Sequence, residues 1–295
     1  MSESKHCFKH PSAVIHSLRF FVHYKEKKLH ELLSHPAIVA GLLPFIVALI
    51  TAELFQRLRL SGLAVIAGLA ATVYFIGDFG FDPFTVARKI IWLGIAASVI
   101  AIPLSLLAWS YWRPILAIMA TGCAVWVTWN LLQKQSIADE LLWGVGCAVY
   151  AGWQVFWFDR LQNKSVAAGN AGFALGIGTG MVALLSTSVQ LGEFGLALGA
   201  ASAAYLFIQA ITNSRLSCGY SFTLPLSLVA GVVACYSFMS TRQPWYTLPV
   251  LALIPLAAKI PVSERWALWL QTLVLSLLTF TCAGAAVYLA WQRPF

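Results

Sequence analysis

Charged residues are scarce in this chain of 295 residues. Asp, Glu, Lys and Arg make up only 10% of it, while 60% of the residues are hydrophobic. A soluble domain cannot bury so much apolar surface, because the outside of a soluble fold needs polar side chains. The composition excludes a soluble globular protein and predicts an all-α polytopic membrane protein.

The apolar segments also lack the groups that chemistry inside a membrane requires. All six histidines lie within the first 35 residues, and the six cysteines form no C-x-x-C pair. The motifs H-E-x-x-H and G-x-S-x-G and a phosphate-binding glycine loop are missing as well. Acidic residues fall at the ends of apolar segments or between them: Glu53, Asp78, Asp82, Asp139, Glu140, Asp159 and Glu193. Ion pumps, metal carriers and intramembrane proteases depend on such groups, so we expect no catalytic residue, no metal site and no cofactor.

Apolar segments of membrane-spanning length are abundant. Ten are expected, at about 37–55, 61–76, 90–110, 114–133, 141–158, 166–188, 194–212, 217–240, 245–258 and 266–291. The ninth is the weakest, because it is short and ends at Lys259, so nine spans is the alternative.

The first 36 residues form a basic segment without the compact apolar core of a cleavable signal peptide. Residues 12–35 carry an apolar stripe at helical spacing, which predicts an amphipathic helix at the membrane surface. The net charge of +8 reflects this segment and the flanks of the spans, which face anionic lipid, and we expect no nucleic-acid partner. Lys and Arg are slightly more numerous on the side of the N-terminus, which favours a cell (inner) membrane protein with both termini cytoplasmic.

The two halves of the chain resemble each other. "GLAVIAGLAA" from Gly62 aligns with "GLALGAASAA" from Gly195, with six identities in ten, and "IVALIT" from Ile46 aligns with "MVALLS" from Met181. The first four spans thus map in order onto spans six to nine, dividing the chain into five-helix repeats at 37–158 and 159–295. Because five is odd, the second repeat enters the membrane from the opposite side, giving a 5+5 inverted-topology repeat.

The length, the ten spans and a repeat of about 135 residues resemble the layout of drug/metabolite-type transporters. The resemblance is one of architecture, with no motif of that family matched residue by residue. It implies a carrier that works by alternating access.

Glycine is concentrated on single faces of three consecutive predicted helices. These faces contain Gly144 and Gly152, then Gly172, Gly176 and Gly180, then Gly195 and Gly199. In lipid, small residues at such spacing let two helix backbones approach closely. We interpret these residues as helix-packing positions.

The run Gly176–Gly180 is also the weakest helical stretch of any span, and its counterpart in the first repeat, residues 41–45, contains Pro44. Paired Gly/Pro interruptions indicate broken helices around a site near the middle of the membrane. The predicted substrate-binding residues are Pro44, Thr51, Asn170, Gly178, Thr179 and Ser186.

The polar residues expected inside the spans are neutral, among them Asn130, Gln154, Gln209 and Gln271. They predict a transporter-like protein that moves a small neutral, weakly polar or lipid-like solute. Trp153 and Trp157, with Tyr150 nearby, either line an aromatic pocket or are lipid-facing or packed rings, and the second interpretation is favoured. The alternative function is a non-catalytic membrane scaffold or assembly subunit, whose small-residue faces bind another integral membrane protein.

Overall fold

The computed structural model describes residues 35–56, 60–76, 85–107, 112–186, 188–214, 216–241, 243–263 and 266–292. The predicted amphipathic segment at residues 12–35 falls almost entirely outside this part of the chain. Throughout the described part the secondary structure is helical. The elements are η1 (Ile38–Leu42), α2 (Leu43–Phe55), α3 (Leu63–Ile76), α4 (Val86–Leu107), α5 (Trp112–Leu132), α6 (Ile137–Asp159), α7 (Ser165–Leu185), α8 (Val189–Thr212), α9 (Gly219–Thr241), α10 (Thr247–Ala252), α11 (Ile254–Ala257) and α12 (Leu268–Trp291).

All ten predicted apolar segments are helical, but they differ in length. Within the described residues, eight helices are long and apolar enough to cross a membrane, and the other two segments, Leu63–Phe75 and Thr247–Ala257, are shorter. The prediction of a polytopic all-α membrane protein is therefore confirmed, with eight of the ten expected spans at full length. The ninth segment is short, as the sequence indicated, and so is the second.

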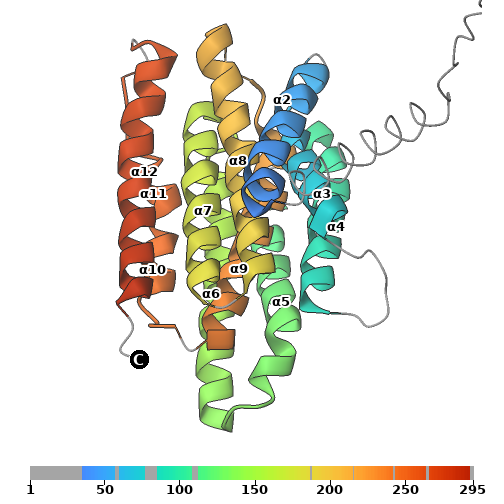
Figure 1. Cartoon of the computed structure of the whole chain (residues 1–295), viewed down its shortest axis with the longest axis vertical. Coiled ribbons are helices and arrows are strands. Elements are labelled where there is room, and N and C mark those ends of the chain that lie inside the picture. Colours follow the sequence, from blue (N-terminus) through green and yellow to red (C-terminus); the bar gives the residue numbers. More distant parts are fainter. Residues whose placement is uncertain are drawn as a thin grey trace, which may run out of the picture.

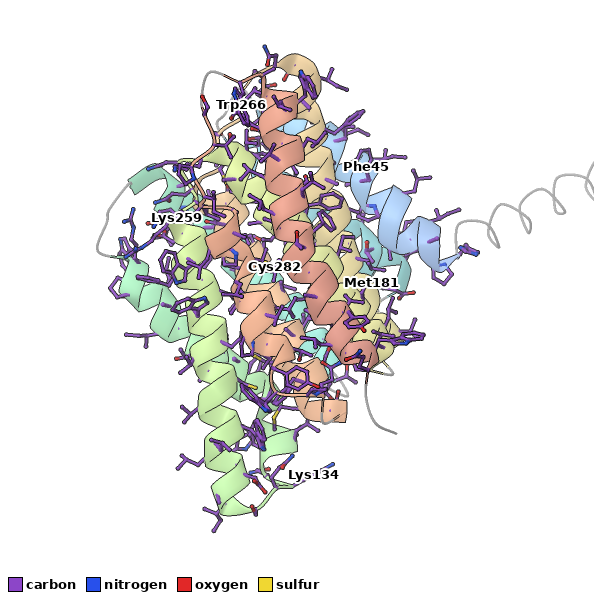
Figure 2. The ribbon with its side chains drawn as sticks, turned by 90° about the vertical axis from the view of Figure 1, so that its left-hand side faces the viewer. Phe45, Lys134, Met181, Lys259, Trp266 and Cys282 are labelled. Carbon is purple, nitrogen blue, oxygen red and sulfur yellow. The ribbon has the colours of Figure 1, made fainter. Side chains whose placement is uncertain are left out.

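Helix α9 forms the centre of the bundle. In its membrane-spanning stretch 94% of the residues are buried, and it packs against α4, α6, α7 and α5. Helices α7 and α12 lie on one side of the bundle and α3 and α4 on the other, and α8 packs against both α7 and the pair α2–α3 (Figure 1). The hairpin of α5 and α6 extends beyond the other helices at one end of the bundle, with Lys134 at its tip (Figure 2).

Local sequence explains where this hairpin turns. Ser136 caps α6, and its hydroxyl accepts a hydrogen bond from the backbone N–H of Asp139 at 3.3 Å. Asp139 and Glu140 place negative charge in the first turn of α6, where the helix dipole favours it.

The predicted repeat is reflected in some helix pairings and not in others. Helices α2 and α3 pack as a pair, as do their counterparts α7 and α8, and α5–α6 has a counterpart in α10–α12. In contrast, α7 packs extensively against α12, whereas its counterpart α2 packs against α8. The inverted-topology repeat stays a prediction.

The predicted interruption of the sixth span is wrong. Helix α7 runs without a break through Gly176–Gly180. In the first repeat, the residues before Pro44 form a π-helical turn, η1, and Pro44 stands in the first turn of α2, where its missing N–H costs little.

Gly176 and Gly180 of α7 instead face α8. A Cβ atom added to Gly195 would lie 2.5 Å from Cα of Gly180, and one added to Gly180 would lie 2.7 Å from the backbone nitrogen of Leu196. A Cβ on Gly176 would collide with the backbone of Gly199. The backbones of α7 and α8 are in direct contact here, at a distance that only glycine permits.

The remaining small residues also face neighbours within the chain. A Cβ on Gly172 would lie 2.8 Å from Oγ of Ser202, and one on Gly152 would lie 2.8 Å from the side chain of Thr121 on α5. Gly144 contacts the side chain of Leu132, also on α5, at ordinary van der Waals distance. These faces are occupied by the protein's own helices.

Candidate functional site

The hydroxyl groups among the predicted substrate-binding residues are bound to their own helices. Thr179 Oγ1 donates to the Leu175 carbonyl at 2.7 Å, and Ser186 Oγ donates to the Ala183 carbonyl at 2.7 Å. Thr51 Oγ1 does the same with the carbonyl of Val47 at 2.7 Å. Each hydroxyl proton is therefore used within its own helix, and the oxygen could only accept a hydrogen bond from a solute.

The other three predicted residues are packing positions in the structure. Asn170 Nδ2 donates to the Val166 carbonyl at 2.8 Å, and its Oδ1 accepts from Ser276 of α12 at 2.5 Å. Gly178 lies against Ala283 of α12, and buried Pro44 lies against Gly68 of α3. Four of the six predicted residues are on α7 or at its C-terminal end, and the other two are on α2. None of the six lines any of the three cavities described below.

A broken helix does occur, but in the ninth segment. Helix α10 ends at Ala252 and α11 begins at Ile254, and Pro255 stands in the first turn of α11. Because proline has no N–H, the carbonyl of Leu251, four residues earlier, lacks the donor that a continuous α-helix would supply.

Two neighbouring side chains of α6 bind the carbonyls at this break. Gln154 Nε2 donates to the carbonyl of Leu251 at 3.2 Å, and Trp153 Nε1 donates to the carbonyl of Ala252 at 3.1 Å. Gln154 Nε2 also donates to the hydroxyl of Tyr150 at 3.0 Å. Backbone groups without helical partners are tolerated inside a membrane only where other protein groups satisfy them, and α6 does so here.

A cavity of about 670 Å³ lies beside the break, between α6, α10 and the end of α9. Its lining consists of Leu142, Trp143, Gly146, Cys147, Val149, Tyr150, Trp153, Phe238, Trp245, Leu248, Pro249, Ala252 and Leu253. Leu142, Val149 and Trp245 are exposed, so the cavity opens sideways, toward the surface that faces lipid when the helices span a membrane.

The lining of this cavity is aliphatic and aromatic and contains no charged side chain. Tyr150 supplies a hydroxyl that Gln154 already binds. A surface of this kind accommodates hydrocarbon, and its polar side-chain groups include the hydroxyl of Tyr150 and the thiol of Cys147. The sequence signalled this site in two ways: Trp153 and Tyr150 were candidates for an aromatic pocket, and the ninth segment was the weakest span.

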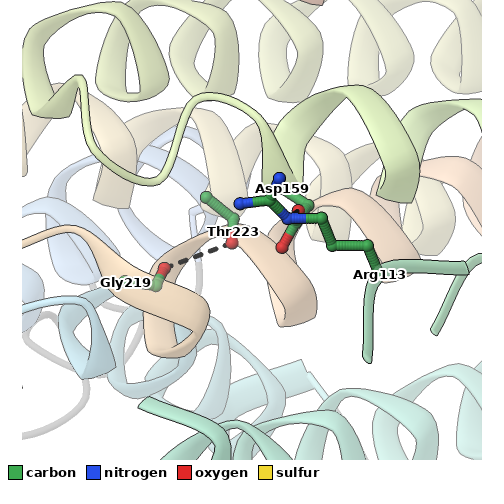
Figure 3. A network of polar contacts seen from close by, with 4 residues as sticks. All are labelled: Arg113, Asp159, Gly219 and Thr223. Atoms are coloured by element: carbon green, nitrogen blue, oxygen red, sulfur yellow. Dashed lines mark hydrogen bonds and ion pairs between the residues drawn. The ribbon is translucent and has the colours of Figure 1, made fainter. Parts of the chain in front are cut away.

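Charged residues gather where α6 ends. Arg113 Nε, at the start of α5, lies 2.7 Å from Oδ2 of Asp159 (Figure 3), and their side chains are 34% and 4% exposed. The guanidinium of Arg160 lies 4.9 Å from the centre of the Trp157 ring, and Nζ of Lys259 lies 4.8 Å from the same centre. A buried carboxylate is thus paired, and two further cations surround an indole ring.

Two smaller cavities also lie in the described part of the protein. One of about 440 Å³ lies between the start of α7, the end of α11 and α12, and includes Lys164, Ser165 and Gln271 in its lining. The other, of about 460 Å³, lies between α5 and α6 and includes Trp129, Leu141 and Gly144.

One acidic residue lies deeper than the sequence indicated. Glu193, expected at the end of a span, is in the second turn of α8 and is buried. Among the described residues, no three His, Cys, Asp or Glu side chains come together in a way that could hold a metal ion.

Comparison with protein-family models and with curated proteins finds no match to this chain. The cavity and the broken helix are therefore the features on which a function can be argued.

Proposed function

We propose that this multi-pass membrane protein is transporter-like and moves a small, lipid-like solute. The part of the solute that enters the cavity is neutral and at most weakly polar. The observation that carries the proposal is the apolar cavity of about 670 Å³ beside the break between α10 and α11. Its lateral opening lets a solute enter from the lipid phase instead of from water.

The break supplies a point at which the wall of the cavity can move. Two carbonyls of α10 accept hydrogen bonds from the side chains of Trp153 and Gln154 of α6. Discontinuous helices of this kind flank the substrate sites of many transporters, where the two parts of the helix change angle. Because Leu248, Pro249 and Ala252 belong to α10 and line the cavity, a change in this angle alters its shape.

A cavity-filling variant tests the proposal. Gly146 lines the cavity, and a Cβ added to it would meet no atom within 4 Å. Gly146→Phe should therefore fold normally and fill the space. Gly122→Phe on α5 is the matched control, since Gly122 is equally open and lies outside this cavity.

The measurement is movement of a net-neutral amphiphile across reconstituted vesicles. NBD-labelled lysophosphatidylcholine in the inner leaflet becomes accessible to dithionite only when it crosses the membrane. We expect wild type and Gly122→Phe to accelerate the crossing, and Gly146→Phe to fall to the rate of protein-free vesicles. Equal rates with and without the wild-type protein would overturn the proposal.

A scaffold function is the second candidate, and the protruding α5–α6 hairpin favours it. The hairpin exposes large apolar side chains, including Ile118, Met119, Trp129, Leu141 and Val145. Its small-residue faces are already packed inside the chain, so a partner would bind these large side chains instead. A photo-crosslinker at Val145 in native membranes should give one discrete protein adduct under this hypothesis, and lipid adducts alone if the hairpin only faces lipid.

A further inference from the structure

The end of α6 presents a cationic aromatic cluster made from two separate elements. Arg160 follows α6 directly, and its guanidinium lies 4.5 Å from the centre of the Phe156 ring and 4.9 Å from that of Trp157. Lys259 follows α11 and approaches the same Trp157 ring at 4.8 Å. The fold thus brings together two cations that are 99 residues apart in the sequence.

The carboxylate nearest to this cluster is engaged elsewhere. Asp159 precedes Arg160 but is buried and pairs with Arg113, at 2.7 Å. Arg160 and Lys259 are both exposed. This end of α6 therefore presents a surplus of positive charge to its surroundings.

The cluster is continuous with the apolar cavity. The rings of Trp157 and Trp153 lie 5.4 Å apart, and Trp153 lines the cavity. Arg160 lies seven positions after Trp153, which corresponds to about 10 Å along the helix axis at a rise of about 1.5 Å per residue. One leaflet of a bilayer contains about 15 Å of hydrocarbon, half of the usual 30 Å. An acyl chain whose headgroup contacts Arg160 consequently reaches the cavity.

We propose that Arg160, Lys259 and the cavity together bind one phospholipid with an anionic headgroup. The phosphate and the headgroup charge contact the two cations, and one acyl chain passes Trp157 and Trp153 into the cavity. Basic pockets between membrane helices favour anionic headgroups by charge, while the apolar wall holds the chain. The inference rests on the proposed function, because it names the class of lipid-like solute that this cavity holds.

Spin-labelled lipids measure this selectivity directly. The full-length protein is reconstituted in phosphatidylcholine, and the motionally restricted fraction is recorded for spin-labelled phosphatidylglycerol and for spin-labelled phosphatidylcholine. The test variant is the double substitution Arg160→Gln with Lys259→Gln. The control, Lys134→Gln with Lys164→Gln, removes the same charge from two exposed lysines that contact neither Trp157 nor the cavity in the structure.

We expect wild type and the control to prefer phosphatidylglycerol several-fold, and the test variant to lose that preference. The preference should also fall in Gly146→Phe, which blocks the path of the chain, and stay in Gly122→Phe. The proposal is overturned if wild type has no preference, or if both double variants reduce it equally, because the effect is then general surface charge.

The two proposals can fail separately. If the neutral lysolipid crosses in a manner that depends on Gly146 but the anionic preference is missing, the lipid class is wrong and the transport function stands. If the preference depends on Arg160 and Lys259 while Gly146→Phe leaves lipid movement unchanged, the binding site stands and the transport function is wrong.

Discussion

The side-chain amide of Gln154 on α6 donates a hydrogen bond of 3.2 Å to the main-chain carbonyl of Leu251, 97 residues further along the chain. This bond takes the place of the one that Pro255 cannot make. The amide thus couples the position of α6 to the broken helix that forms the opposite wall of the cavity.

A double-mutant cycle tests that replacement. Gln154→Leu removes the side-chain donor of the buried Leu251 carbonyl, which should lower the free energy of unfolding by about 1–3 kcal/mol. In a Pro255→Ala background, residue 255 provides its own N–H, so the same substitution should cost less. The bond to Tyr150 is lost in both backgrounds and cancels. Equal costs in the two backgrounds, measured by thermal unfolding in detergent, would contradict the assignment.

The contact between α7 and α8 predicts a strong dependence on residue size. In Gly195→Leu the new Cβ would lie only 2.5 Å from Cα of Gly180. The loss of stability should therefore exceed the roughly 1–3 kcal/mol that is typical of overpacking. Gly284→Leu on α12 is the control, because no atom lies within 4 Å of its new Cβ. We expect the melting temperature to drop in the first variant only. Similar melting temperatures for the two would show that the helices separate at little cost.

The ion pair at the end of α6 predicts rescue by a second substitution. Arg113→Gln leaves Asp159 buried without its partner, and breaking a buried pair in this way costs about 3–5 kcal/mol. Because the side chain of Arg113 is 34% exposed, solvent screens part of the interaction between the two charges. We therefore expect a loss of stability at the lower end of this range. Adding Asp159→Asn removes the stranded charge and should restore most of the lost stability. A double variant no more stable than Arg113→Gln alone would show that the loss has another cause.

Cys218, in the connection between α8 and α9, predicts a decline in stability at alkaline pH. Burial raises the pKa of its thiol well above the ordinary value of 9.0. The unfolded chain therefore releases this proton near pH 9 while the folded protein retains it, so the contribution of Cys218 to stability is lost as the pH rises above 9. Between pH 8 and pH 10 the melting temperature of wild type should fall more than that of Cys218→Ala. Parallel curves would mean that the thiol ionises normally.

Much of the helical layout could be predicted from the sequence, because hydrophobicity over a span length is a local property. The weakness of the ninth segment was visible in the same way, since it is short and ends at Lys259. The position of the helix break could not be predicted from the sequence. Gly176–Gly180 retains its helical bonds because α8 packs directly on these residues, and that contact replaces the side chains that they lack.

The candidate site depended on contacts that the sequence does not contain. Gln154 was expected to be one of several neutral residues in the bundle, and nothing in its local sequence indicates that it faces a proline in another helix. Arg160 and Lys259 were counted only as flanking charges, because their shared contact with Trp157 exists only once α6 and α11 have packed.

The central position of α9 also bears on how the protein assembles during synthesis. Helices α4, α5 and α6 precede α9 in the chain, yet each buries a face against it. Until Gly219–Thr241 enters the membrane, those faces remain in contact with lipid or with other proteins. The pairs α2–α3 and α5–α6 can pack before that point, whereas the contacts of α4, α5 and α6 with α9 form only after α9 has inserted.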